Sequence, residues 1–326
     1  MLHKGLLLAL LSWTVAVAAE GQKVPSLSLG GLLFGDLYYI PSNHLEKGEY
    51  AAGAVVRRGY FTVDARFSDA WFGRVRLELN QSGEFETYTF SSQLKDLYLG
   101  WDIGRQRILL GKSPTPTFDL IESIWGYRYL ARTPMDMQGA PSRETGVSAK
   151  GPLDASGRFA YRTMWSDNDI VMGALTWRPA PEWTLDLYAD YQWKPGSADR
   201  TTLQAFIAYQ SSLTHWGLQY SNQTGQNVPP LKLLSTFLTH RVSENTSVVG
   251  RVDHLLTPSP KGNDIAYLPF DPTARATMFI GGVEFMVSPN FSVTPNAVVN
   301  FYERNPAGVR PRTDIYVRLT LFLNFE

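Results

Sequence analysis

The sequence predicts an all-β protein: a transmembrane antiparallel β-barrel of about 16 strands with a long in-folded loop after the fifth strand. Apolar and polar residues alternate in short runs to the end of the chain, short and long connections take turns, and a leader precedes the first run. A period of two gives strands with two unlike faces. Repeated along nearly the whole chain, it indicates one apolar outside that meets lipid and one polar inside that meets water.

The last run shows the alternation most clearly. One face carries Ile315, Val317, Leu319, Leu321, Leu323 and Phe325, and the other carries Asp314, Tyr316, Arg318, Thr320 and Asn324. With the apolar positions outward, strands are expected near residues 27–40, 54–67, 72–81, 91–103, 106–113, 144–151, 158–166, 169–178, 183–194, 201–211, 215–223, 231–242, 246–256, 274–287, 290–302 and 312–325.

The first 19 residues have the features of a secretory signal peptide. Lys4 supplies positive charge, residues 5–17 are mostly apolar, and Ala18 and Ala19 offer small-residue cleavage sites. The alternative is a membrane anchor, but the run is shorter than the roughly 20 apolar residues that cross a bilayer. We therefore expect a signal peptide over residues 1–19 and a single barrel domain over residues 20–326.

Composition narrows the class of protein further. The chain has no cysteine, which suits an envelope protein and excludes a disulfide scaffold and a lipid-modified N-terminal cysteine. Its 30 Lys and Arg balance its 30 Asp and Glu, which argues against nucleic-acid binding. Nine Trp, 16 Tyr and 17 Phe would supply the aromatic girdles of a barrel.

The connections give an independent check, because outer-membrane barrels pair short periplasmic turns with longer external loops. The even-numbered connections are short, such as residues 104–105, 179–182 and 288–289, and the odd-numbered ones include residues 41–53, 114–143 and 257–273. Both chain ends then lie on the periplasmic side. Prolines fall in the connections except Pro295, where we expect a bulge or a local break.

A soluble β-sandwich is the competing fold, since alternation alone fits both. A sandwich would not need large aromatic residues at the ends of runs. The chain places Trp177, Trp183, Trp193 and Trp216 there.

The inward faces of the second and third strands are dense in charge. The candidate channel-wall residues are Arg58, Arg66, Arg74, Arg76, Glu78 and Asp96. A packed interior could not hold so many charges without pairing, whereas a water-filled lumen can. The inward cations and anions nearly cancel along the chain, so no strong selectivity is expected from the overall charge. Each arginine either pairs with an acid across the strands or contributes to solute selection.

The connection over residues 114–143 is the second candidate site, because it is too long and too apolar to remain in water. If it folds into the barrel, it buries Phe118, Ile121, Ile124 and Trp125, with a short helix over residues 118–129. The residues that it would offer to the channel constriction are Asp119, Glu122, Arg128, Arg132 and Asp136. An external lid or an oligomer contact would use the same aromatic residues.

Three segments of the chain resemble Gram-negative outer-membrane porins: residues 57–63, residues 110–117 and the long connection that follows. Residues 142–147 are similar to the group related to phosphate-selective porins. The resemblance implies a third external loop that constricts the channel, and a homotrimer. It does not carry over phosphate selectivity, because the lysine and arginine clusters for that task have no match here. The C-terminal strand resembles the aromatic-ended assembly segment, with Glu326 placed after Phe325.

No catalytic or cofactor-binding pattern is present in the sequence. The mature chain has His44, His215, His240 and His254, none in a hydrolase motif, and Asp253 and His254 should point to opposite faces of a strand. No phosphate-binding loop and no metal-ligand spacing occur. We expect no enzyme, no cofactor and no metal.

The sequence therefore predicts a porin in the outer membrane of a Gram-negative bacterium. It would be surrounded by lipid and lipopolysaccharide and would pass small hydrophilic solutes or ions by passive diffusion. The alternatives are a non-conducting structural or adhesive barrel plugged by its long loop, and an outer-membrane enzyme.

Overall fold

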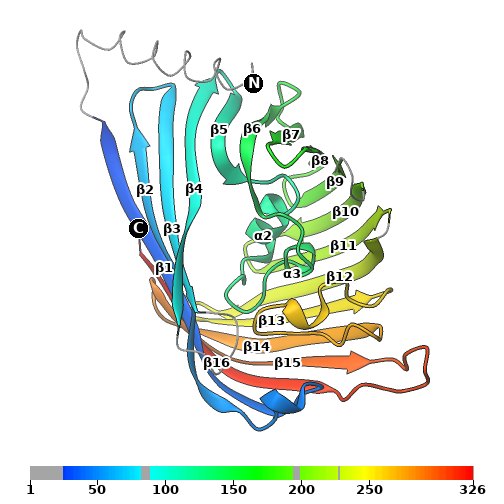
Figure 1. Cartoon of the computed structure of the whole chain (residues 1–326). Coiled ribbons are helices and arrows are strands. Elements are labelled where there is room, and N and C mark those ends of the chain that lie inside the picture. Colours follow the sequence, from blue (N-terminus) through cyan, green and yellow to red (C-terminus); the bar gives the residue numbers. More distant parts are fainter. Residues whose placement is uncertain (1–24, 82–88, 194–198, 227, 326) are drawn as a thin grey trace.

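The computed structural model describes residues 25–81, 89–193, 199–226 and 228–325, so the predicted signal peptide lies outside the described residues. Within this part of the chain, sixteen antiparallel strands form a closed barrel in which each strand pairs with the next and β1 pairs with β16 (Figure 1). The predicted fold class and strand number are confirmed.

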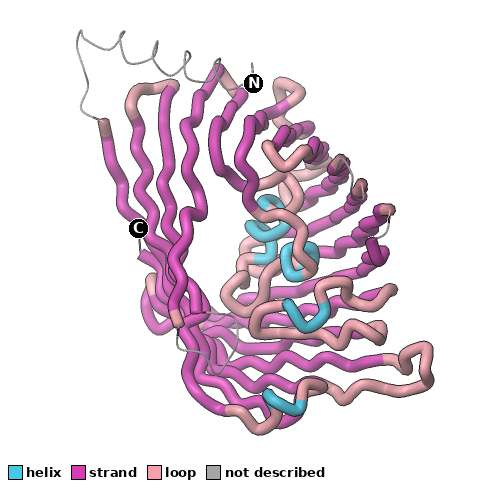
Figure 2. Tube along the Cα trace, in the orientation of Figure 1, coloured by secondary structure: helices cyan, strands magenta, loops and turns pink. Residues whose placement is uncertain are grey.

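The strands are β1 (Ser26–Ser42), β2 (Ala52–Arg66), β3 (Trp71–Gln81), β4 (Phe90–Ile103), β5 (Gln106–Pro114), β6 (Arg143–Pro152), β7 (Phe159–Ser166), β8 (Ile170–Trp177), β9 (Trp183–Gln192), β10 (Arg200–Gln210), β11 (Thr214–Gly225), β12 (Val228–Ser243), β13 (Thr246–Leu255), β14 (Ala276–Ser288), β15 (Phe291–Tyr302) and β16 (Asp314–Phe325). The helical segments are η1 (Glu46–Gly48), α2 (Asp119–Trp125), α3 (Pro134–Met137) and η2 (Gly262–Asp264). All four lie in connections between strands (Figure 2).

Burial is inverted relative to a soluble protein. In the β1–β16 pair, Asp36 and Thr320 lie opposite one another and are buried on the inside, whereas the neighbouring Leu37 is 50% exposed on the outside. A sandwich would bury its leucines and expose its aspartates, so the soluble alternative is excluded. Among the described helices, none has both the length and the apolar character needed to cross a membrane.

The two ends of the barrel differ. At one end, which we call the short-turn end, β4–β5, β6–β7 and β8–β9 are joined by a few residues each. The other end, the long-loop end, carries the connections that we call L1 (residues 43–51), L3 (residues 115–142) and L7 (residues 256–275). The aromatic pairs Trp71–Trp101 and Phe159–Trp177 stack on neighbouring strands near the short-turn end.

Pro295 produces a gap rather than a bulge. Toward β14 the pairing passes from Gly282↔Asn296 to Phe285↔Val293 with the two pairs between them missing, and the register is unchanged. Toward β16, Pro295 pairs with Leu319 in a continuous ladder. The ring removes one donor, so the break affects one side of the strand only.

Two bulges change the facing of the strands. Phe34 pairs with Arg58 and Gly35 pairs with Val56, which leaves Arg57 as an extra residue in β2. In β4, Lys95 is extra in the same way, between the pairs Arg76↔Asp96 and Leu77↔Leu94. A bulge turns its extra residue away from the direction that alternation dictates.

Candidate channel constriction

L3 lies within the barrel and is fixed to the wall at its start (Figure 1). The hydroxyl of Thr117 donates to the hydroxyl of Tyr188 on β9 over 2.7 Å, and Gln204 Nε2 on β10 donates to the Thr117 carbonyl over 2.9 Å. These hydrogen bonds hold the start of L3, directly after β5, against the wall formed by β9 and β10.

Helix α2 packs its apolar face on that wall. Ile121, Ile124 and Trp125 are buried, and the Trp125 ring lies 5.2 Å from the ring of Phe237 on β12. The predicted helix over residues 118–129 is too long: the helix ends at Trp125 because Gly126 follows in the left-handed conformation with φ 72°. The predicted burial of Phe118, Ile121, Ile124 and Trp125 agrees with the structure.

The residues 129–132 of L3 are held by their main-chain carbonyl groups. Arg57 donates to the carbonyls of residues 129 and 130, Arg318 to that of residue 130 over 3.1 Å, and Arg251 to that of residue 132 over 2.6 Å. Trp125 Nε1 donates to the remaining carbonyl, of residue 131, over 2.9 Å. Donors from β2, β13 and β16, together with Trp125 of α2, thus fix four successive carbonyl groups.

We call Arg57, Arg251 and Arg318 the anchoring arginines. Their side chains are 8%, 1% and 0% exposed, and each has a carboxylate partner: Asp36 for Arg57 and, more distantly, Arg318, and Asp253 for Arg251. Charge that is buried and paired in this way stabilises the loop.

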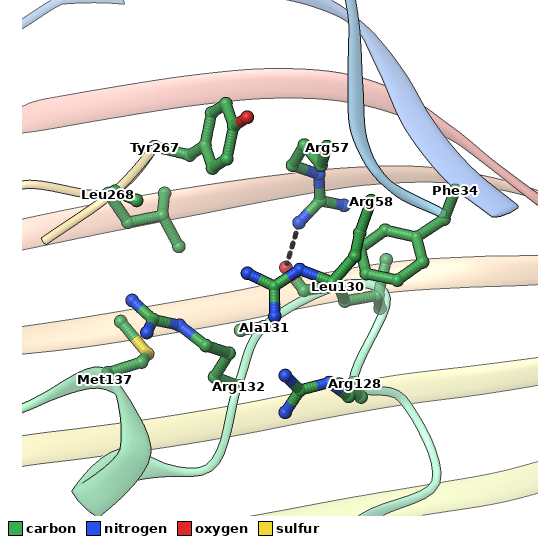
Figure 3. Close-up of a pocket in the computed structure, with 11 residues that line it drawn as sticks. Phe34, Arg57, Arg58, Arg128, Leu130, Ala131, Arg132, Met137, Tyr267 and Leu268 are labelled. Carbon is green, nitrogen blue, oxygen red and sulfur yellow. Dashed lines mark hydrogen bonds between the residues drawn. The ribbon is translucent and has the colours of Figure 1, made fainter. Parts of the chain in front are cut away.

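A second set, which we call the channel-facing arginines, consists of Arg58, Arg128 and Arg132. Their side chains are 16%, 15% and 22% exposed. They converge from β2 and from L3 on a cavity of about 40 Å³ (Figure 3). The rest of its lining consists of Phe34, Arg57, Met137, the L3 residues 130–131 and the L7 residues 266–268. In the same view the dashed line joins Arg57 to the carbonyl of Leu130.

Two of the three acids near this cavity are less accessible than the arginines, whereas Glu122, which binds Arg128, is 22% exposed. Asp136 lies 3.0 Å from Arg128 and 3.7 Å from Arg132 and is 8% exposed, and Glu78 is 1% exposed. Burial alone would raise the pKa of Asp136, but the charges of Arg128 and Arg132 outweigh it and lower the pKa. Asp136 was predicted to face the channel and instead lies buried beneath the arginines.

The accessible charged side chains around this cavity are three arginines and one acid, Glu122. Burial, together with the neighbouring charges of Arg58 and Arg128, lowers the pKa of Arg132 even though Asp136 acts in the opposite direction. Burial and the charge of Arg132 likewise lower the pKa of Lys261 on L7. Burial is the larger cause of both pKa shifts, and the neighbouring cations act in the same direction.

L7 also folds inward and packs on L3, which the sequence analysis did not anticipate. Ser259 donates to Gln138 over 2.7 Å, and Leu268 and Phe270 share one apolar cluster with Met137. Ile265 and Tyr267 belong to the same cluster. The apolar residues in this 20-residue connection were the available signal.

The predicted wall residues fall into two groups according to the acids that they bind and where those acids lie. Two of the arginines bind acids away from the constriction. Arg74 forms a bidentate pair with Asp64, its cross-strand neighbour, over 2.6 and 2.8 Å. Arg66 binds Asp102 at 3.3 Å near the short-turn end, away from the constriction.

The other predicted wall residues form a network close to the constriction. Asp96 is shared by Arg76 at 3.5 Å and Arg143 at 2.5 Å. Glu78 is shared by Arg58 at 3.4 Å and Lys95 at 3.0 Å. Of the wall residues named from the sequence, Arg58 alone lines the cavity of the constriction.

Two of the predicted loop residues, Glu122 and Asp119, lie at different heights along the barrel axis. Glu122 binds Arg128 within L3, whereas Asp119 lies toward the short-turn end, 3.8 Å from Lys150 of β6.

Sequence reasoning missed Arg57 and Lys95, because strict alternation directs both toward lipid. The signal was present: each is followed directly by another charged residue, and one of two successive charges in a regular strand would face hydrocarbon. A bulge relieves that cost. In the described residues no group of three or more acids and histidines could hold a metal ion.

No protein-family model matches the sequence, and no curated protein matches it. Solved structures do match. The anion-selective porin from Comamonas acidovorans is 14% identical with a TM-score of 0.67, over 93% of this chain and 100% of that chain. The outer membrane channel DcaP of Acinetobacter baumannii is 12% identical with a TM-score of 0.67, over 92% and 97%.

A mutant of the Rhodopseudomonas blastica porin is 12% identical with a TM-score of 0.60, over 92% of this chain and 100% of that chain. At these identities the likeness shows a shared fold. The chain has the 16-stranded barrel fold of porins.

Proposed function

We propose that this chain is an outer-membrane porin whose water-filled channel passes small hydrophilic solutes by passive diffusion, with a preference for anions. The observation that carries the proposal is the constriction, where three arginines, Arg58, Arg128 and Arg132, are accessible beside one accessible acid, Glu122. The other two acids, Asp136 and Glu78, are 8% and 1% exposed. The porin fold of the barrel supports the channel itself.

The anion preference follows from which charges solvent reaches. An ion in the constriction meets three partly exposed guanidinium groups and one partly exposed carboxylate, Glu122, while Asp136 and Glu78 are screened by the cations that bind them. In water, one unit charge at 4 Å changes the free energy of an ion by about 1 kcal/mol, and more in a narrow aperture. The name of the Comamonas porin, anion-selective, agrees with this proposal. Phosphate selectivity is not part of it.

Reversal potentials across a salt gradient test the proposal. Purified, folded protein in planar bilayers should give discrete conductance and a chloride permeability above that of potassium. Replacing Arg58 and Arg132 by Gln should lower the chloride preference by about fivefold per charge at 1 kcal/mol each. The control Arg275→Gln removes a cation that pairs with Glu303, outside the constriction, and should leave the ratio unchanged. Equal reversal potentials in wild type and the double variant would contradict the anion preference.

A plugged, non-conducting barrel is the second candidate, and the inward packing of L7 on L3 favours it. The cavity at the constriction, of about 40 Å³, holds only a few waters, each of which needs roughly 10–15 Å³. Deleting residues 118–138 separates the two functions. A porin's conductance should rise from an existing level, whereas a plugged barrel should change from silent to conducting.

The proposed setting follows from the same function. The short-turn end would face the periplasm, residues 1–19 would direct export, and the exposed leucines of the wall would contact outer-membrane lipid and lipopolysaccharide of a Gram-negative bacterium. Assembly as a homotrimer rests on the resemblance to porins. Chemical cross-linking of the purified protein in detergent tests it.

A further inference from the structure

A second cavity lies at the short-turn end, on the other side of α2 from the constriction. We call it the vestibule. It measures about 460 Å³ and lies between α2 and the wall formed by β6, β7 and β8, with residues of their adjoining turns and of the β4–β5 turn. Its charged lining consists of Arg105, Lys150, Arg162, Arg178 and Asp119. Four cations thus meet a single acid.

The strand register places like charges side by side beneath this cavity. Arg107 of β5 is directly opposite Lys150 of β6, and Lys150 is directly opposite Arg162 of β7. Like charges in directly opposed positions destabilise a sheet. Neighbouring strands are about 4.8 Å apart, so the row of three cations extends over about 10 Å of the wall.

The nearby acids compensate this charge only in part. Arg107 pairs with Asp102 at 2.7 Å, and Arg162 pairs with the buried Asp186 at 3.0 Å. Lys150 has only Asp119, at 3.8 Å, and both side chains are more than 40% exposed.

The two remaining cations of the vestibule have no acid partner. Arg105 donates to the main-chain carbonyls of residues 154 and 155. Within the described residues, no carboxylate lies within 4 Å of Arg178. Arg105, Lys150 and Arg178 are therefore available to a bound anion.

We propose that the vestibule is a binding site for linear anions that carry two or more separated negative charges. A compact anion reaches one or two cations of the row, whereas an extended one spans adjacent strands and meets Lys150 together with Arg162 or Arg178. Polyphosphate and polycarboxylate share this chemistry. The inference rests on the proposed function only in that solutes reach the site through the channel.

Calorimetric titration of the full folded chain in detergent tests the site without requiring conductance. The probes are tripolyphosphate, tricarballylate and, as the compact reference, orthophosphate. At least one extended anion should bind at least about tenfold more tightly than orthophosphate. The double variant Lys150→Gln/Arg178→Gln should weaken that binding by about tenfold or more. The two extended probes separate phosphate from carboxylate as the source.

Two variants exclude trivial explanations. Arg275→Gln/Arg312→Gln removes the same charge at the long-loop end, where both arginines pair with glutamates, and should leave binding unchanged. Asp119→Asn removes the competing acid and should tighten binding severalfold, which a purely structural role would not produce. Heat-modifiable migration on gels confirms that each variant is folded.

Current block locates the site in the channel. A cysteine at Leu213, in the exposed β10–β11 turn of a cysteine-free chain, identifies the compartment that faces the short-turn end. Extended anions added there should block at lower concentration than when added to the opposite compartment. Extended anions that bind no better than orthophosphate, or binding that survives Lys150→Gln/Arg178→Gln, would overturn the inference. Absence of conductance with intact binding would overturn only the proposed function.

Discussion

The hydroxyl of Tyr267 donates a hydrogen bond of 2.9 Å to the main-chain carbonyl of Gln81, and this contact joins L7 to the end of β3. In the wall, β15, β16, β1 and β2 lie between β14 and β3, so the contact spans a section of the barrel mouth. Tyr267 has φ 65°, a left-handed conformation that is strained for a large side chain. The inward position of L7 is therefore maintained against a local cost.

Removing that hydroxyl should loosen L7. In Tyr267→Phe, a cysteine at the buried L7 residue Ala274 should react faster with a charged thiol reagent than the same cysteine in the parent. One net hydrogen bond of about 1 kcal/mol corresponds to about a fivefold rate increase if opening limits the reaction. Tyr39→Phe, on the lipid-facing side of β1, is the matched control. Equal labelling rates would show that the Tyr267 contact does not restrain the loop.

Arg57 and Arg58 are adjacent in sequence, but replacing them should lower the stability of the protein by different amounts. Arg57→Gln leaves Asp36, fully buried, with Arg318 as its only cation at 3.9 Å, and breaking a buried pair costs about 3–5 kcal/mol. Arg58→Gln leaves Glu78 bound to Lys95 at 3.0 Å and should cost much less stability. Urea unfolding followed by tryptophan fluorescence measures both variants. Equal loss in the two would contradict the division into anchoring and channel-facing arginines.

The fold was predictable from the sequence because the features that determine it involve only neighbouring residues. Alternation, turn length and proline placement act over a few residues, and Asp314–Phe325 already displays both faces of β16. The constriction was only partly predictable. Arg128 and Arg132 follow from the composition of L3, but the burial of Asp136 depends on which arginines bind it, and the inward packing of L7 depends on the surface that L3 offers.

The predicted inward or outward direction of side chains was wrong at the two bulges, where the strand register shifts. Arg57 and Lys95 lie one residue out of the pattern, and no property of a single residue reveals a bulge. The pairs Arg57–Arg58 and Lys95–Asp96 do reveal it together, because two successive charges are incompatible with a regular strand in lipid. The bulges therefore add two cations to the interior that the sequence-based charge count left out.

The bulge in β4 gives a direct prediction of accessibility. Lys95→Cys should react with a water-soluble charged thiol reagent, because the Lys95 side chain lies inside near Glu78 and is 12% exposed. Leu97→Cys, two residues on and exposed on the outer wall, should be protected in lipid bilayers. Since the chain contains no native cysteine, no background correction is needed. The reverse labelling pattern would place Lys95 in lipid and remove the bulge.

His44 gives the pH dependence of the long-loop end. Its Nδ1 lies 2.8 Å from Asp314 on β16, and its Nε2 lies 2.8 Å from the side-chain oxygen of Asn263 on L7. Tyr302 on β15 contacts the ring, and Asp271 adds negative charge from L7. Burial opposes the charged form, but the hydrogen bond and charge of Asp314 outweigh it, so the pKa of His44 is raised.

A raised pKa fixes the sign of the effect. The stability that protonated His44 contributes is fully present below its ordinary pKa of about 6.5 and is lost as pH rises through the higher folded-state pKa. Only the imidazolium donates to both Asp314 and the Asn263 oxygen, so deprotonation weakens the tie between L1 and L7. Unfolding should therefore show wild type more stable than His44→Gln at about pH 5.5, by at most about 3 kcal/mol, with the difference shrinking toward pH 8.5. His240→Gln, whose histidine contacts Thr214 at the short-turn end, should show no such trend. A difference that grows with pH would mean that His44 is neutral in the folded protein, with Asp314 held by Tyr302, Asn300 and the main-chain N–H of His44.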